Sequence, residues 1–188
     1  MTTSPLLLSF CLLTAPLAYA AETPSADVHH PADTQRQADV ARRGAEVMPF
    51  DLAKTTHVFT KTANGGTQRV VAKDAGDAGQ VRAVRRHLRE IEGQFRKGDF
   101  SAPEQIHGAS MPGLEELRSA PRGAVAIRYA DVPGGGLLTY SSRDTKLVSA
   151  LHRWFDAQLS DHGADAMEGH AQMHGGKPMH DGTPMHNH

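Results

Sequence analysis

The residue types best suited to metal chemistry gather near the C-terminus. Residues 173–178 and 179–184 share the pattern M-H-x-G-x-P, and residues 185–188 (MHNH) begin a third copy. Glycine and proline in both full copies disfavour a helix, so we expect a flexible, low-complexity segment. Five of the twelve histidines and four of the seven methionines of the chain lie in residues 164–188. This density predicts a segment that binds metal ions.

Thioether sulfur is a soft, uncharged ligand that favours Cu(I) or Ag(I), whereas imidazole binds copper, zinc and nickel. Methionine recurs in step with histidine here, and a segment for zinc alone would not need it. We therefore predict binding of copper, as Cu(I) or Cu(II), with silver or zinc as alternatives. A solubilising tail without metal is the competing interpretation. The candidate ligands are Met167, His170, Met173, His174, Met179, His180, Met185, His186 and His188.

A second set of candidate ligands lies in the region with folding signals. His107 and Met111 stand four residues apart, His152 and Asp156 are one helical turn apart, and His162 follows in the last turn of the same predicted helix. One interpretation is structural. Another is a mixed nitrogen and sulfur metal site of His107, Met111, His152 and His162, or a haem site with His and Met axial ligands. A third is a small enzyme in which His107, His152 and Asp156 transfer protons.

The N-terminus has the features of a secretory signal peptide. The apolar residues 6–13 precede Ala18-Tyr19-Ala20, which predicts cleavage after Ala20 and export to the periplasm. The run is too short to span a bilayer, so no stable membrane insertion is expected after cleavage. Cys11 is the only cysteine and would leave with the signal. The mature chain is then expected to have no disulfide, thiolate metal site or covalently attached haem.

Charge and motif content argue against several classes of function. Lys and Arg number 20 against 21 Asp and Glu, and this balance does not favour nucleic acid. The sequence has no nucleophile elbow, Walker A loop, dinucleotide-binding fingerprint or H-E-x-x-H motif. An enzyme is therefore less well supported than a metal-binding protein. The partners we expect are metal ions and a periplasmic copper-handling protein.

The ligands must be positioned by a domain between residues 48 and 163, where the folding signals lie. β-prone runs at residues 56–62 and 67–72 flank Asn64-Gly65, a strong hairpin signal. Alternation over residues 124–131, a glycine-rich turn and residues 137–141 predict a second hairpin.

Two amphipathic helices are predicted from apolar side chains at offsets of three and four. The first follows a cap at Asp77 and runs to about Lys97. The last begins at Ser142 or Asp144 and ends at Gly163. The apolar stripes are Val81, Val84, Leu88, Ile91 and Phe95 in the first, and Leu147, Leu151, Trp154, Phe155 and Leu159 in the last.

The predicted order is β-β-α-β-β-α, with a loop at residues 101–110 and a short helix after Pro112. Two hairpins covered on one face by helices make a two-layer α+β domain. Residues 21–47 carry few large apolar side chains and are predicted to be a disordered linker. Residues 164–188 are predicted to be a disordered metal-binding tail.

Three segments, IHGASMPGL, RYADVPGG and LHRWFDAQLSDHGADA, resemble a small family of uncharacterised proteobacterial exported proteins, over the whole predicted domain. Members are sometimes named aspartate carbamoyltransferase, an activity that this sequence does not support. It is too short for the two-domain enzyme, is expected to be exported, and lacks the Ser-Thr-Arg-Thr-Arg phosphate-binding pattern. The tail is similar in composition to periplasmic silver- and copper-binding proteins with M-x-x-H and H-x-x-M repeats, which implies metal buffering.

Overall fold

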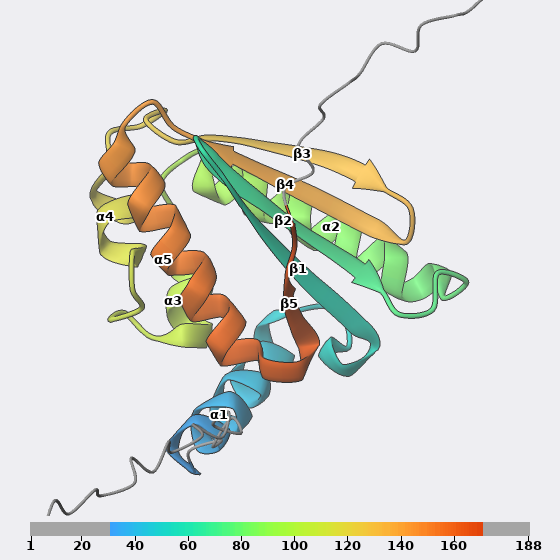
Figure 1. Cartoon of the computed structure of the whole chain (residues 1–188). Helices are drawn as coiled ribbons and strands as arrows, with labels where there is room; N and C mark the ends of the chain where they lie inside the picture. The colour runs from blue at the N-terminus through green and yellow to red at the C-terminus, as the bar shows by residue number, and fades with distance from the viewer. Residues whose placement is uncertain (1–30, 171–188) are drawn as a thin grey trace, which may run out of the picture.

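A five-stranded sheet with helices packed against it forms the body of the computed structural model, which describes residues 31–170 (Figure 1). In chain order the elements are α1 (Pro31–Val47), η1 (Leu52–Lys54), β1 (Thr55–Thr62), β2 (Gly65–Ala72), α2 (Ala78–Phe95), α3 (Ser101–His107), α4 (Leu114–Ser119), β3 (Ala126–Val132), β4 (Gly135–Ser141), α5 (Thr145–His162), η2 (Gly163–Asp165) and β5 (Ala166–Glu168). The predicted α+β class is confirmed. None of the helices within this range is long and apolar enough to cross a membrane.

The sheet buries one face. Its strand order is β3-β4-β2-β1-β5, and every pair is antiparallel except β1 with β5. His57 and Phe59 of β1 are buried and pair with the buried Val70 and Gln68 of β2. Their neighbours on the other face are partly buried or, like Arg69, exposed. Alternate burial of this kind requires a cover on one side only, as the pattern predicts.

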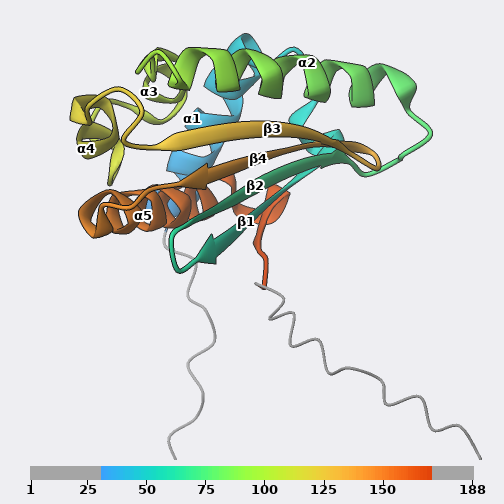
Figure 2. The same ribbon diagram turned by 90° about the horizontal axis from the view of Figure 1, so that it is seen from above.

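That cover consists mainly of α2 and α5. In Figure 1, α2 lies behind β3 and β4, while α5 lies beside β1 and β2, and Figure 2 shows both helices lengthwise. Phe59 of β1 and Phe155 of α5 have ring centroids 5.3 Å apart. Phe95 of α2 meets Trp154 of α5 edge-on at 5.8 Å, which joins the two helices in one core.

The helix caps that the sequence predicts are formed. The Asp77 carboxylate accepts hydrogen bonds from the backbone of Gly79 and Gln80 at the start of α2. Asp144 accepts one from Lys146 at the start of α5, and so satisfies an amide that the helix leaves unpaired. The predicted α5 therefore begins and ends where its sequence signals lie.

The first hairpin turns on fewer residues than expected. Strand pairing continues to Thr62 opposite Gly65, so that only Ala63 and Asn64 form the loop. Gly65, with φ of 149°, takes the backbone conformation that side chains disfavour.

Three segments differ from the prediction. Residues 31–47 form α1 rather than a wholly disordered linker, with Val40 fully buried. Residues 101–107 form α3 rather than a loop. Residues 166–168 form β5 inside the segment predicted as a disordered tail, because they pair in parallel with β1. All three are held by contacts with distant parts of the chain, which a local composition argument does not include.

Candidate functional site

Four histidines from four elements line one narrow cavity. They are His57 of β1, His87 of α2, His107 of α3 and His162 of α5. The cavity volume is about 30 Å³, which is room for an ion or for about two water molecules. A haem or an organic substrate of ordinary size does not fit unless the surrounding helices move.

His57 and His162 meet because the start of β1 and the end of α5 lie at the same place. His57 occupies an inward-facing position of β1, and His162 is the last residue of α5. Gly163, at φ +52°, then reverses the chain so that β5 pairs with β1, with Ala166 opposite His57. The two imidazole rings lie with centroids 4.9 Å apart and planes only 6° from parallel.

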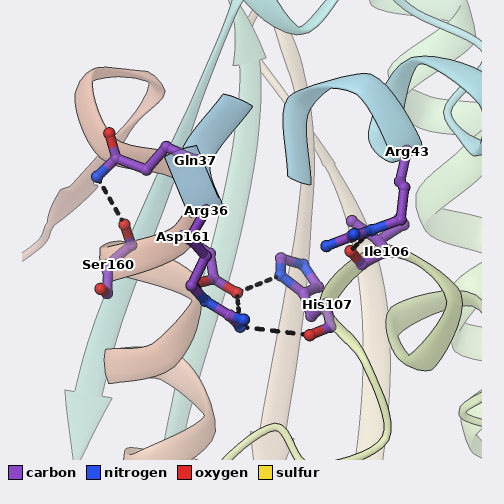
Figure 3. A network of polar contacts seen from close by, with 7 residues as sticks. All are labelled: Arg36, Gln37, Arg43, Ile106, His107, Ser160 and Asp161. Carbon is purple, nitrogen blue, oxygen red and sulfur yellow. Dashed lines mark hydrogen bonds and ion pairs between the residues drawn. The ribbon is translucent and has the colours of Figure 1, made fainter. Parts of the chain in front are cut away.

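His107 is fixed by a buried carboxylate. Its Nδ1 lies 2.8 Å from Oδ2 of Asp161, and both side chains are 2% exposed (Figure 3). A hydrogen bond to a carboxylate requires a proton on Nδ1, which leaves the lone pair of a neutral ring on Nε2. The ring centroid of His107 is 5.2 Å from that of His162, with the planes at 83°.

Helix α1 holds this pair from the outside. Arg36 donates through Nη2 to Oδ2 of Asp161 at 2.8 Å and to the backbone carbonyl of His107 at 3.3 Å. Arg43 donates to the carbonyl of Ile106 at 2.6 Å (Figure 3). These carbonyls end α3 and have no partner within the helix, so the two arginines complete its C-terminus.

The charges around Asp161 favour its ionised form. Burial alone would raise the pKa of the Asp161 carboxyl, but the hydrogen bonds from His107 and Arg36 outweigh burial and hold the pKa below its usual value. Asp161 therefore remains a carboxylate, which keeps the proton on His107 Nδ1. The histidine is thereby oriented in one tautomer.

The other three histidines are kept neutral. Burial, together with the neighbouring His162 and His87, lowers the pKa of His57 well below its usual value. Burial also lowers the pKa of His87, beside Arg86, to about 4. Burial and the nearby His107 do the same for His162, again to about 4. At neutral pH these imidazoles carry lone pairs rather than charge.

Two buried ring nitrogens have no partner within residues 31–170. Nδ1 of His57 makes no hydrogen bond, although the residue is 1% exposed. The indole Nε1 of Trp154, on the same cavity, is also unpaired. An unsatisfied buried polar group costs about 1–3 kcal/mol. Nδ1 of His57 is thus a desolvated nitrogen of a residue that lines the cavity.

Neutral imidazoles oriented by a carboxylate are typical ligands of transition metals. As the side chains stand, no group of three or more His, Cys, Asp or Glu residues in the described part of the chain is arranged to hold an ion. The site is therefore a collection of ligand-type groups whose rings would have to turn before they could share one.

The structure separates several residues that the sequence grouped. Nε2 of His152 lies 3.1 and 2.9 Å from the backbone carbonyls of Thr62 and Gly65, so this ring ties α5 to the first hairpin. Asp156 is exposed and forms an ion pair with Lys61. The predicted catalytic group of His107, His152 and Asp156 is therefore not assembled.

Met111 is 3% exposed and belongs to the hydrophobic core, so it does not join His107 and His162 in a mixed site. Of the predicted tail ligands, Met167 and His170 lie in the described range and both are exposed. The remaining predicted ligands lie outside the described residues: Met173, His174, Met179, His180, Met185, His186 and His188.

Sequence reasoning missed His57, His87, Asp161 and Arg36. Two signals were present. His57 is two residues before the apolar Phe59 and so shares its face of β1. His87 adjoins the apolar stripe of α2. Both therefore occupy buried positions. A histidine at a predicted buried position needs a hydrogen-bond partner or a functional role.

The site thus joins residues from both ends of the domain, from α1 to the last turn of α5. His162 lies four residues before the first residue of β5, Ala166, and His57 pairs with Ala166, at the point where the His/Met-rich segment begins. The chain was compared with models of protein families, with curated proteins and with solved structures, and no match was found.

Proposed function

We propose that the chain is an exported, periplasmic protein that binds and buffers soft metal ions, copper first and silver as an alternative. The ligands are the histidines and methionines of the C-terminal segment, and a cleaved N-terminal signal directs export. The α+β domain is the platform from which this segment extends.

The observation that carries the proposal is the side chain of Met167 on β5. It is 53% exposed, whereas Met111 in the core is 3% exposed. A single exposed apolar side chain is ordinary on protein surfaces. Met167, however, is three residues before His170 and six before Met173, in step with the repeat that follows. Its thioether is therefore accessible at the start of a regular series of soft ligands.

The start of that series is anchored. β5 pairs with β1, with Met167 opposite Val58, and the backbone amide of Gly169 donates to the carbonyl of Phe59 at 2.8 Å. His170 follows with its side chain exposed. Ligands on a chain tethered at one point can gather around an ion at little entropic cost, because the loops between them are short.

The segment suits exchange rather than permanent storage. The Gly and Pro residues of the repeat predict that its ligands would lose conformational freedom on binding, which lowers the affinity for each ion. Moderate affinity allows metal to be collected and passed on. A periplasmic copper-handling protein is the partner that this role requires.

The test compares the mature full chain with a variant called here the ligand-free tail variant. In it Met167, Met173, Met179 and Met185 become Leu, and His170, His174, His180, His186 and His188 become Asn. Cu(I) is titrated anaerobically against a chromophoric Cu(I) chelator. The parent is expected to withdraw more than one Cu(I) per chain, and the variant to lose most of this capacity.

A matched control changes the same segment without removing a ligand, by Lys177→Ser, Asp181→Asn and Thr183→Ser. It is expected to bind copper like the parent. If the ligand-free tail variant and the parent bind the same number of Cu(I) ions, the C-terminal segment is not the metal-binding element and the proposal fails.

A further inference from the structure

We propose that His57, His107 and His162 form a second, internal metal site that binds one Cu(I) ion inside the folded domain. The three rings belong to β1, α3 and α5 and line the same cavity of about 30 Å³. That volume admits an ion and excludes larger ligands. The inference does not depend on the ligands of the C-terminal segment.

The ring positions match those of imidazoles that share an ion. A ring nitrogen bound at about 2 Å places the ring centroid about 3 Å from the metal, so two rings on one ion have centroids about 5 Å apart. The observed separations are 4.9 Å for His57 with His162 and 5.2 Å for His107 with His162. His162 is therefore at the separation that sharing an ion requires from each of the other two rings, and the rings must turn before one ion can bind between them.

The His162 ring is the one that can rotate most easily. No side chain or carbonyl of residues 31–170 forms a hydrogen bond with the His162 ring. Rotation of an imidazole about its second side-chain dihedral angle has broad minima. His57 offers its unpaired Nδ1 without breaking any bond at that atom. His162 thus completes the site when an ion enters.

Asp161 and Arg36 supply the support that metal-binding histidines usually have. A carboxylate on the far nitrogen fixes the ring and raises the basicity of the ligating nitrogen. Asp161 does this for His107 at 2.8 Å, and Arg36 holds Asp161 in turn. Asp161 is a positioning residue here, because its oxygens contact His107 and Arg36 rather than the cavity.

The cavity favours a singly charged soft ion. Among the described residues that line it there is no Asp, Glu, Lys or Arg, while Met48 contributes a thioether. The cost of moving an ion out of water rises with the square of its charge, and no lining carboxylate offsets that cost for a divalent ion. The charge of Asp161 is already paired with Arg36. Neutral imidazoles with a nearby thioether therefore select Cu(I) over Zn²⁺.

The experiment uses the mature ligand-free tail variant, so that the internal site is measured without the ligands of the C-terminal segment. Cu(I) is titrated against a chromophoric chelator while the emission of Trp154, the only tryptophan, is recorded. Trp154 lines the cavity, so binding there is expected to change its emission with an end point at one equivalent. Zn²⁺ is expected to bind at least tenfold more weakly than Cu(I).

Four substitutions in this background locate the site. His57→Gln and His162→Asn are each expected to weaken Cu(I) binding at least tenfold, and Asp161→Asn by about 10- to 100-fold. Met48→Leu preserves volume and so preserves the fold; it is expected to weaken Cu(I) binding severalfold and leave Zn²⁺ binding unchanged.

A matched control is His152→Gln, which removes a histidine of the same helix and is expected to leave Cu(I) affinity within twofold. The inference is overturned if the ligand-free tail variant binds no Cu(I), or if it binds Zn²⁺ more tightly. It is also overturned if His162→Asn and Met48→Leu bind Cu(I) as tightly as their parent. These outcomes leave the proposed role of the C-terminal segment intact, since that role is read from the difference between the parent and the ligand-free tail variant.

Discussion

His152 and His162 lie on the same helix, ten residues and so about 15 Å apart, but their surroundings differ. The His152 ring is within hydrogen-bond distance of two backbone carbonyls of the first hairpin. The His162 ring faces two other imidazoles across a narrow cavity. His152 already contacts hydrogen-bond partners, whereas His162 is available as a ligand. Residue type alone would not separate a structural histidine from a candidate ligand, whereas the partners of each ring do.

The largest effect expected from this contrast is on acid stability. Burial lowers the pKa of His87 and of His162 from 6.5 to about 4, and also lowers that of His57 well below its usual value. As the pH falls from 6.5 to 4, the unfolded chain takes up protons that the folded chain refuses, and the free energy of unfolding falls. Each such group contributes at most about 3 kcal/mol. Urea denaturation of metal-free protein at intervals between pH 7 and 4 measures the loss.

His87→Leu provides the check on this prediction, since it removes one titrating ring and retains an apolar side chain against Phe50. The stability of this variant is expected to fall less steeply over the same pH range. An identical pH dependence in parent and variant would mean that His87 is not held neutral in the folded state.

A smaller loss is expected from Asp161→Ala. The substitution removes the carboxylate that His107 and Arg36 share, and leaves the buried His107 Nδ1 without its partner. Arg36 is 46% exposed and can return to water. We therefore expect the free energy of unfolding to fall by about 2–3 kcal/mol, below the range for a fully buried pair. A change under about 0.5 kcal/mol in urea denaturation would show that this pair does not hold α1 and α3 together.

His152→Gln is expected to lower mainly stability, and His162→Asn mainly Cu(I) binding. His152→Gln disturbs the contacts with Thr62 and Gly65 and is expected to cost about 1 kcal/mol of stability. His162→Asn removes a ring that makes no hydrogen bond with residues 31–170, and it is expected to cost less stability while weakening Cu(I) binding. Thermal denaturation paired with Cu(I) titration of both variants measures this. If both variants lose stability and copper alike, the contrast between the two rings is wrong.

The smallest effect is expected at Asp156, which sequence reasoning placed in a catalytic group. Its ion pair with Lys61 is at the surface, with the carboxylate side chain 56% exposed. Asp156→Asn should change the free energy of unfolding by less than about 0.5 kcal/mol. A loss above 1 kcal/mol would indicate a role that its exposed position does not explain.

Local sequence signals predicted the two hairpins and the helices α2 and α5 well. Asp77 and Asp144 cap α2 and α5, and Gly163 ends α5, because caps and stops depend on neighbours within one turn. Helix α1 was missed for the opposite reason. Its arginines contact residues far along the chain, Asp161 through Arg36 and Ile106 through Arg43.

Only some of the histidines that line the cavity were predicted as ligands. His107 and His162 were among the candidate ligands, but their meeting with His57 depends on how α5 and β1 pack, which no spacing in the sequence encodes. His152 was grouped with them because it shares a helix with His162. Ten residues of rise along that helix place it instead beside the turn between β1 and β2.

The number of copper ions bound with and without the C-terminal ligands tests the proposed copper binding most directly. Native mass spectrometry of the mature full chain and of the ligand-free tail variant, each with excess Cu(I) under anaerobic conditions, counts them per chain. We expect more than one Cu(I) on the parent and one on the variant. Equal numbers on the two proteins would contradict the account.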